Sequence, residues 1–563
     1  MEPVMTEDDR IWLKSYDSWI PADITIPDIT YLELLDRAFI EFPTKTACRF
    51  LDTSLNFHDL DRFSRCFASF LSQSGYRTGD VVAINLPNTP QFLIAHTGAL
   101  RANCLPTGLS PLLSSREMVH QLNDCRARLL VTVESMLADK FLKTQHQIPN
   151  LSHVIVCNLE DFGTGNTTPS PKMAWRSGNI FLGFMDILQD FKPKRLLQKT
   201  KPQDVCLIQY TGGTTGPPKG TMLTHQNVVA DILQCNQWLK VQRGCEVYLS
   251  AFPFSHLAGL ALGMTAMGMG HTQIIIPNPR DTRHICNEIA CHRPTIMAFV
   301  PSLYRMLLQD SKFKTLDFSA CRICLSGAAP LSPELMEAVE SVVGKGKVVE
   351  VYGLTETFIL TMNPYYGKKK TGSVGLPLQS TRIKIVDLEN GRQEMSIGEE
   401  GELIAQGPQI MKGYYNRPDA TERTFRRFEN QKWIYTGDVA KIDEDGYLNI
   451  VDRLKDMIIV GGYKVFSREV EEVLFEHPAV AFSAVVGVPN PERPGSELVK
   501  AIIQLTAEYV NTPHHTLEGE LTAYCRKNVA PYKVPGMMEF TEEIPLTAVG
   551  KVDKKLLQPS KIG

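Results

Sequence analysis

The chain has 563 residues, which is too long for one hydrophobic core and predicts two or more domains. A hydrophobic content of 43% and a charged content of 21% are typical of a globular protein, and a net charge of −3 excludes the basic field of a nucleic-acid-binding protein. The acidic start lacks the pattern of a signal peptide, and thirteen cysteines, an odd number, favour reduced thiols in a cytosolic setting.

Helices and short apolar strands alternate in the first part of the chain. Helical spacing of apolar residues predicts helices at 30–42, 64–75 and about 88–101. Strands are predicted at 46–50, 80–86, 104–108 and 129–133, and this alternation is typical of α/β units. Residues 159–180 are polar and rich in turn formers, so we interpret them as a mobile surface insertion.

A glycine-rich loop follows the buried strand predicted at 205–208. Residues 211–220 hold four glycines, three threonines and Lys219. Glycine lets a backbone approach a ligand closely, while amide N–H groups, hydroxyls and one lysine suit a polyphosphate. The loop is not a Walker A motif, because its lysine precedes the last glycine. Taken alone, such a loop could also be a surface turn.

The middle of the chain contains one segment that needs a test for membrane insertion. Residues 257–276 are apolar, but His271, Gln273 and several glycines interrupt them, whereas a spanning helix needs about 20 mostly apolar residues. We expect a helix and then a strand at 272–277, with peripheral membrane contact as an alternative. Further helices are expected at 224–239 and 301–309, and a strand at 294–300.

Several short motifs in the next part have residue types suited to nucleotide chemistry. Small residues at 326–331 permit close backbone approach, and Ser332 with Pro333 predicts a helix start. Tyr352 offers a flat face for adenine, and Glu356 offers hard oxygen to Mg²⁺. Cys321 and Cys324 have no second pair at zinc spacing, so we expect them to be core residues on a strand.

An acidic residue and a charged cluster follow. Strands are expected at 382–386 and 401–405, and Asp438, in a predicted strand-end turn, could bind both hydroxyls of a ribose. Four charged residues between apolar strands at 450–460 predict a domain boundary, giving domains 1–453 and 454–563. Beyond it we expect a helix at 468–477 capped by Ser467, a helix at 517–528, and strands at 480–488, 499–505 and 537–540.

Residues 211–220 resemble the phosphate loop of the adenylate-forming (AMP-binding) superfamily, which contains acyl-CoA synthetases, luciferases and peptide-synthetase adenylation domains. The motifs at 326–331, 352–356, 372–377, 433–438, 450–463 and 545–552 follow in the family's order, so the resemblance covers roughly residues 30–557. Gly212, where Ser is commoner, resembles bacterial long-chain fatty-acid–CoA ligases. The resemblance implies an α/β fold: a large N-terminal AMP-binding domain of αβα layered sheets with a small β-barrel-like sheet, and a small mobile α+β C-terminal lid domain.

The resemblance also implies roles for individual residues, with ATP, Mg²⁺ and coenzyme A as ligands. The catalytic residues would be Lys551, Glu356, His256 and Thr355, with His256 beside the acyl pocket. Thr214 and Glu356 would bind Mg²⁺. The nucleotide phosphates would contact Thr211, Gly212, Gly213, Thr214, Thr215, Gly216 and Lys219. The adenosine would contact Gly327, Ala328, Tyr352, Gly353, Asp438 and Arg453. The hinge and the pantetheine tunnel would use Lys455, Gly461, Gly462 and Tyr463.

These roles imply activation of a carboxylic acid as acyl-AMP with release of pyrophosphate, and then acyl transfer to the thiol of coenzyme A. The small residues Gly259, Ala261 and Gly263 would leave room for a medium- or long-chain fatty acid, or would simply pack a helix tightly. An aryl-CoA ligase of the coumarate type and an acyl-AMP ligase that loads a carrier protein are the nearest alternatives; a non-catalytic nucleotide-binding regulator is another. We expect small-molecule substrates, no nucleic acid, a monomer or homodimer, and a cytoplasmic protein with at most peripheral contact at the inner face of the membrane.

Overall fold

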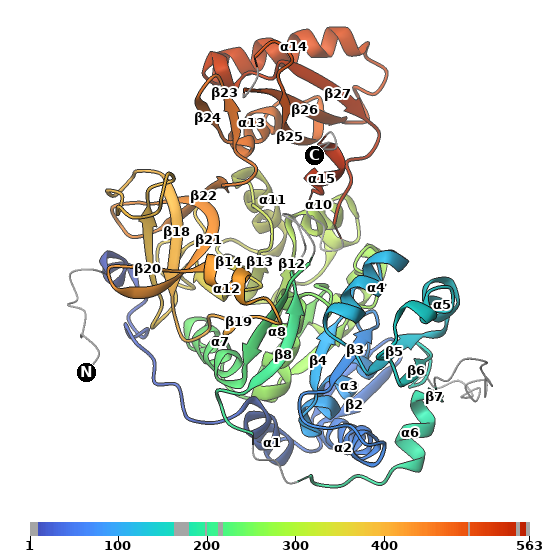
Figure 1. The fold of residues 1–563 in the computed structure, drawn as a ribbon. Coiled ribbons are helices and arrows are strands. Elements are labelled where there is room, and N and C mark those ends of the chain that lie inside the picture. The colour runs from blue at the N-terminus through green and yellow to red at the C-terminus, as the bar shows by residue number, and fades with distance from the viewer. Residues whose placement is uncertain are drawn as a thin grey trace.

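The computed structural model describes residues 10–162, 180–196, 200–211, 218–493, 496–547 and 552–558. Layers of helices and two large sheets make up most of the molecule, and the C-terminal elements form a separate smaller unit at the top of Figure 1. This arrangement confirms the predicted α/β class, with a large N-terminal part and a small C-terminal part.

The largest sheet has nine strands, of which the central ones are parallel. In spatial order these are β16 (Leu376–Pro377), β15 (Phe358–Met362), β14 (Val348–Leu354), β13 (Ile323–Ser326), β12 (Ile296–Phe299), β10 (Val247–Ser250), β11 (Thr272–Ile275), β1 (Thr46–Phe50) and β2 (Thr53–Asn56). Strands β11, β12 and β13 are buried along their length, and β10 is buried except at its first residue, as expected for parallel strands covered on both faces. Their carboxyl ends lead into the motifs at His256 and Gly327.

A second, parallel sheet and a three-stranded antiparallel sheet lie beside the first. The parallel sheet consists of β4 (Leu105–Gly108), β3 (Val81–Asn85), β5 (Leu129–Val133), β6 (His153–Cys157) and β7 (Ile180–Gly183). The antiparallel sheet consists of β19 (Gly413–Tyr414), β9 (Gly220–Thr224) and β8 (Val205–Tyr210). Because β8 and β9 pair with each other, the glycine-rich loop is the connection of a hairpin.

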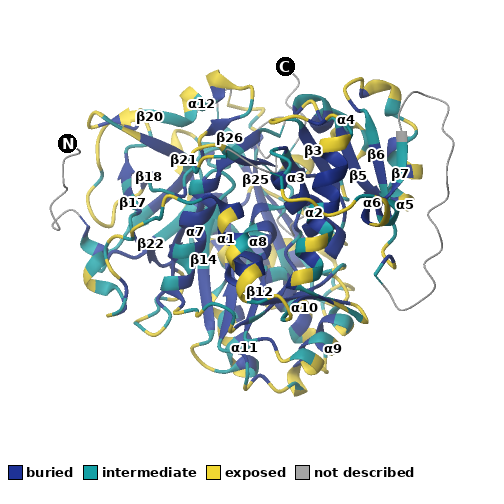
Figure 2. Cartoon of the chain, turned by 90° about the horizontal axis from the view of Figure 1, so that it is seen from below, coloured by how far each residue is buried: buried dark blue, intermediate teal, exposed yellow. Residues whose placement is uncertain are grey.

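Helices cover these sheets with apolar faces inward and exposed residues outward (Figure 2). They are α1 (Tyr31–Glu41), α2 (Phe57–Gln73), α3 (Pro90–Arg101), α4 (Ser115–Asp124), α5 (Glu134–Met136), α6 (Phe184–Asp190), α7 (His225–Trp238), α8 (Leu257–Met269), α9 (Thr282–His292), α10 (Pro301–Gln309) and α11 (Pro333–Val343). Thr30, Asn56, Ser114 and Thr224 each form a reciprocal capping box, which fixes where four of these helices begin.

A small antiparallel sheet and the C-terminal unit complete the fold. The small sheet contains β17 (Arg382–Val386), β18 (Gly401–Gln406), β20 (Phe425–Phe428), β21 (Gln431–Ile442) and β22 (Leu448–Arg453), with α12 (Pro418–Thr424) beside it. The C-terminal unit contains the hairpin of β23 (Ile458–Val460) and β24 (Tyr463–Val465), the sheet of β25 (Val480–Pro489), β26 (Glu497–Leu505) and β27 (Met537–Thr541), and helices α13 (Ser467–Phe475), α14 (His514–Asn528) and α15 (Lys554–Leu557).

Most predicted elements are confirmed, but three local predictions are corrected. The helix predicted from Ser64 begins at Phe57, because Asn56 provides the cap. Ser467 does not cap α13: it is the first helical residue, and its hydroxyl donates to Asp452 at 2.9 Å. Asp438 does not end a strand, since β21 continues past it to Ile442.

The apolar segment at 257–276 forms α8 and β11, as predicted. Across the part of the chain that the structure describes, every helix is too short or too polar to cross a bilayer. Cys321 and Cys324 are buried at β13 with their sulfur atoms 3.6 Å apart. All thirteen cysteines are free thiols, and of these only Cys245 and Cys291 are exposed.

Candidate functional site

The base of the glycine-rich loop is closed by two hydrogen bonds. The Thr211 amide donates to the Lys219 carbonyl at 3.0 Å, and the Lys219 amide donates to the Thr211 hydroxyl at 3.2 Å. The loop therefore leaves and re-enters the sheet at a fixed point between β8 and β9. The other predicted phosphate ligands of this loop, Gly212, Gly213, Thr214, Thr215 and Gly216, lie outside the described residues.

Tyr414 joins the predicted phosphate lysine to the predicted magnesium ligand. The Lys219 ammonium lies 4.2 Å from the centre of the Tyr414 ring, a cation–π contact, and the Tyr414 hydroxyl donates to Glu356 Oε1 at 2.7 Å. Burial raises the pKa of Tyr414, and the neighbouring Glu356 raises it further, so the hydroxyl stays protonated. The Lys219 ammonium and the Glu356 carboxylate thus both contact the side chain of Tyr414.

Tyr414 was not among the predicted site residues. Tyr414 is positioned by β19, which pairs with β9 directly after the glycine-rich loop. Glu356 is held by its own backbone, since its carbonyl accepts from the Met411 amide at 2.9 Å. The sequence signal was the Gly-Tyr-Tyr run at 413–415, which had no assigned role.

The predicted adenosine contacts meet at Asp438, which is 1% exposed. The Tyr352 hydroxyl donates to Asp438 Oδ2 at 2.5 Å, and Arg453 Nε lies 2.9 Å from Oδ1. Asp438 and Arg453 are direct partners in the β21–β22 ladder, so the sheet itself sets this ion pair. The Asp438 charge raises the pKa of Arg453, and burial raises that of Tyr352 well above its usual value. A buried carboxylate held by one hydrogen bond and one ion pair is organised before any ligand arrives.

Three small residues near Tyr352 lie where a larger residue would be unfavourable, two because space is lacking and one because of its backbone conformation. A Cβ on Gly353 would lie 1.8 Å from the Phe358 carbonyl oxygen, and one on Gly327 would lie 2.6 Å from Val351. Ala328 has φ of +65°, a left-handed conformation that is costly for a residue with a side chain. The turn after β13 is therefore packed directly against β14, beside Tyr352. Thr355 lies in the turn after β14, next to Glu356.

His256 has a structural role in the described fold. It is the N-cap of α8, and its Nδ1 accepts from the Ala258 amide at 3.3 Å. A Cβ on Gly259 would lie 2.3 Å from the Pro253 carbonyl, so this glycine is required for helix packing. Gly263 is less tightly enclosed: a Cβ there would lie 3.3 Å from the Phe254 ring, so that the ring would have to shift slightly, and at ordinary contact distance from Leu93 and Gln273.

The predicted hinge follows β22. Burial lowers the pKa of Lys455 to about 8. Gly461 and Gly462 have φ of +57° and +89° at the β23–β24 turn, and both are exposed. Tyr463 is 60% exposed and stacks on Tyr532 with ring centres 4.6 Å apart. Lys551 lies outside the described residues.

A magnesium ion is compatible with the residues present, although nothing in the structure identifies one. The described parts of the chain contain no group of three or more His, Cys, Asp or Glu side chains placed to hold a metal. Mg²⁺ commonly uses one or two protein carboxylates together with substrate phosphates and water. Glu356, which accepts a hydrogen bond from Tyr414 close to Lys219, provides one such carboxylate.

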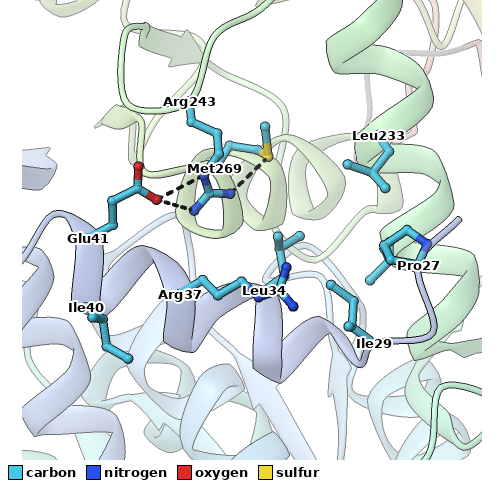
Figure 3. Close-up of a pocket in the computed structure, with 10 residues that line it drawn as sticks. Pro27, Ile29, Leu34, Arg37, Ile40, Glu41, Leu233, Arg243 and Met269 are labelled. Atoms are coloured by element: carbon cyan, nitrogen blue, oxygen red, sulfur yellow. Dashed lines mark hydrogen bonds and ion pairs between the residues drawn. The ribbon is translucent and has the colours of Figure 1, made fainter. Parts of the chain in front are cut away.

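The hollow in Figure 3 is separate from these residues. It has a volume of about 440 Å³ and lies on the outer surface over α1, α7 and the end of α8. Its lining is mainly apolar, with Arg37, Glu41 and Arg243 among the apolar side chains. It contains none of the predicted nucleotide-binding residues.

Comparison with known sequences gives two matches to family models. The model for AMP-binding enzyme matches residues 35–415, and the model for AMP-binding enzyme C-terminal domain matches residues 469–551. The long-chain-fatty-acid–CoA ligase of Bacillus subtilis is 36% identical, covering 97% of each chain. A feruloyl-CoA synthase from an Amycolatopsis species is 30% identical, covering 91% of this chain and 95% of its own.

Solved structures agree with the sequence matches. ATP-bound MatB from Rhodopseudomonas palustris aligns with a TM-score of 0.81, and its apo form aligns with 0.71; both are 26% identical and cover 94% of this chain and 98% of their own. Both matching family models describe AMP-binding enzymes, and a relative that is 36% identical matches nearly the whole chain. The chain belongs to the AMP-binding enzyme family.

Proposed function

We propose that this protein is an ATP-dependent acyl-CoA synthetase that activates a medium- or long-chain fatty acid. The observation that carries the proposal is the Lys219–Tyr414–Glu356 cluster at the base of the glycine-rich loop, which puts a cation and a hard carboxylate together for a polyphosphate. The Bacillus subtilis relative, a long-chain-fatty-acid–CoA ligase matched along nearly its whole length, supports the choice of acid.

In the first half-reaction, a carboxylate oxygen of the fatty acid attacks the α-phosphorus of ATP, and pyrophosphate leaves. Lys219 and the Thr211 hydroxyl, with Thr214 and Thr215, hold the β- and γ-phosphates. The Asp438 carboxylate, organised by Tyr352 and Arg453, binds the ribose. Mg²⁺ held by Glu356 and Thr214 would neutralise charge on the phosphates. Lys551 stabilises negative charge where the bond forms.

In the second half-reaction, the thiol of coenzyme A attacks the acyl carbonyl and AMP leaves. The part of the chain after Arg453 rotates about Lys455, which takes Lys551 away and brings Gly461, Gly462 and Tyr463 to the thiol path. The split into 1–453 and 454–563 is supported by sheet pairing, because each sheet of the described residues lies wholly on one side of it. The two family models also leave residues 416–468 between them.

The test is pyrophosphate release with ATP across a panel of carboxylic acids, followed by mass spectrometry of products with coenzyme A. We expect saturated acids of medium and long chain to give the highest turnover and a coenzyme A thioester. Preference for coumaric or ferulic acid would favour the aryl-CoA alternative, which the feruloyl-CoA synthase relative motivates. Acyl-AMP without thioester would favour a carrier-loading ligase. No pyrophosphate with any acid would overturn the proposal.

We further place the enzyme, as a monomer or homodimer, in the cytoplasm with peripheral contact to the membrane. The thirteen free thiols support a reducing compartment. The hollow of Figure 3 supports membrane contact, since Ile40 beside it is 81% exposed and Arg37 is also exposed. Sedimentation with anionic phospholipid vesicles should fall for Ile40→Asp but not for Ile397→Asp, an exposed isoleucine elsewhere; equal sedimentation of both would remove this surface from consideration.

A further inference from the structure

Four polar side chains form a continuous chain of contacts between β22, α13 and α15. The Ser467 hydroxyl donates to Asp452 Oδ2 at 2.9 Å, and Lys554 Nζ donates to the Ser467 oxygen at 2.6 Å. Lys554 also forms an ion pair with Glu471 at 2.8 Å. We call Asp452, Ser467, Glu471 and Lys554 the Lys554 network.

The network is largely shielded from water. The side chains of Lys554 and Glu471 are 18% and 16% exposed, and Ser467 is fully buried. Burial lowers the pKa of Lys554, but Glu471 and Asp452 raise it more, so the net change is upward and the ammonium stays charged. Glu471 is fixed further by the Val485 amide, which donates to it at 2.7 Å. Removal of one charge would therefore leave its partner buried and unpaired.

The contact of the network between Asp452 and Ser467 crosses the predicted pivot, Lys455. The contacts of Lys554 with Ser467 and Glu471 do not cross it. Asp452 precedes Lys455, whereas Ser467 follows it. Arg468 adds two crossing contacts, from its amide to Asp452 at 3.3 Å and from its guanidinium to the Ile450 carbonyl at 2.7 Å. Rotation about Lys455 must break all of these. The contacts of Lys554 with Ser467 and Glu471 lie after the pivot and would move together.

Lys554 also fixes one side of the segment that carries Lys551. It is the third residue after Lys551 and the first residue of α15. The same segment is closed at its base by a bridge between Leu546 and Val552 and by the Asp553 amide, which donates to the Pro545 carbonyl at 2.8 Å. The described ends of this segment, at Leu546 and at Val552 to Lys554, are therefore joined to β22 through Lys554 and Ser467.

In the proposed mechanism, thioester formation requires a different arrangement from the one in the structure. Gly461, Gly462 and Tyr463, which would line the thiol path after rotation, are exposed to solvent. The chain aligns with a TM-score of 0.81 to the ATP-bound form of MatB and of 0.71 to the apo form. In the proposed mechanism the structure corresponds to the arrangement before the rotation, and in it the network joins the C-terminal part to β22.

We propose that Lys554 is a positioning residue for acyl-AMP formation: through Ser467 it links the segment bearing Lys551 to the hinge strand β22, and this link breaks when the C-terminal part rotates. The inference rests on the proposed function. It predicts that loss of the link slows the first half-reaction while the second, in which the link is already broken, keeps its rate.

The experiment measures both half-reactions of the full-length chain: ATP–pyrophosphate exchange with a fatty acid, and thioester formation from supplied acyl-AMP and coenzyme A. For Lys554→Met we expect exchange to fall about 10- to 100-fold, with thioester formation within about twofold of wild type. Lys554→Arg should restore most of the exchange rate, because a guanidinium can reach both Glu471 and Ser467. The matched control is Lys527→Met, an exposed lysine of α14, which should leave both rates unchanged.

Three results would overturn the inference: equal loss in both half-reactions, an unchanged exchange rate, or no recovery in Lys554→Arg. If Lys554→Met does not fold, as judged by circular dichroism, Ser467→Ala tests the same link by removing one oxygen, and we expect about a tenfold loss in exchange alone. Failure of the proposed function would be distinct, since wild-type enzyme would then show no exchange.

Discussion

The proposed nucleoside end and the proposed phosphate end of the site are held in different ways. At the nucleoside end, Asp438 and Arg453 are neighbours in one antiparallel ladder, and Asp438 is almost fully buried. At the phosphate end, Lys219 is at the foot of a hairpin loop and meets Glu356 only through the ring of Tyr414. In the proposed mechanism, the part of the nucleotide that stays unchanged would be bound by a sheet, and the part that reacts would be bound by loops and side-chain contacts.

We expect the largest loss of activity from a substitution of Lys551, the residue proposed to act where the bond to the α-phosphorus forms. In the proposed mechanism Lys551 stabilises the transition state, so acyl-AMP formation by Lys551→Ala should fall about a thousandfold. Thioester formation from supplied acyl-AMP should continue, because in that mechanism Lys551 has left the site before this step. Rapid-quench measurement of each half-reaction checks this. A similar loss in both would contradict the assigned role.

We expect the next largest change, in the KM for ATP, from a substitution at the proposed nucleoside end. Asp438→Asn keeps the shape but removes the charge that pairs with Arg453 and would bind the ribose hydroxyls. We expect the KM for ATP to rise about 10- to 100-fold, with a smaller change in kcat. The control is Glu394→Gln, whose exposed carboxylate pairs with Lys384 of β17 in the same sheet. An unchanged KM for ATP would separate Asp438 from the nucleotide.

Tyr414→Phe should have an intermediate effect that separates the two interactions of this side chain. The ring that supports Lys219 remains, but the hydrogen bond to Glu356 is lost. We expect kcat for pyrophosphate exchange to fall about 3- to 10-fold and its Mg²⁺ dependence to weaken. Tyr415→Phe, the neighbouring tyrosine, is the matched control. If both variants behave alike, Tyr414 does not position Glu356.

The smallest effect concerns the hinge and depends on pH. The pKa of Lys455 is about 8 in the folded chain and 10.5 as its ordinary value, so between these pH values the unfolded state binds more protons. The free energy of unfolding of wild type should therefore increase with pH in this window relative to Lys455→Met. Urea denaturation at pH 7.5 and pH 10 measures this. A difference between the two proteins that does not change with pH would show that Lys455 titrates normally.

The sequence predicted most elements because apolar periodicity alone defines them, as in β5, α10 and the change from α8 to β11. The family's motif order grouped Tyr352, Asp438 and Arg453 as contacts of one ligand, and in the structure these three side chains lie together; their binding of a nucleoside stays a prediction. The sequence could not predict the Lys219–Tyr414–Glu356 cluster, because Tyr414 is 58 residues from Glu356 and the contact depends on β19 pairing with β9.

The two local errors near the hinge have a common cause. Ser467 precedes an acidic, amphipathic stretch and was expected to cap it, but Asp452 in β22 accepts its hydroxyl instead. Asp438 was expected in a turn at a strand end, yet β21 continues past it to Ile442; the preceding Gly437 has φ of +72° inside this strand, and its amide donates to Glu402 at 3.2 Å. In both places a partner distant in sequence outweighed the local preference.

The distribution of thiols offers a direct way to observe the rotation. Since only Cys245 and Cys291 are exposed, replacing these two with serine would leave a protein whose remaining sulfhydryls react slowly. Two new cysteines, one on each side of Lys455, could then carry a donor and an acceptor dye. Their energy transfer would report the swing of the C-terminal part during a single turnover, in real time and without a crystal.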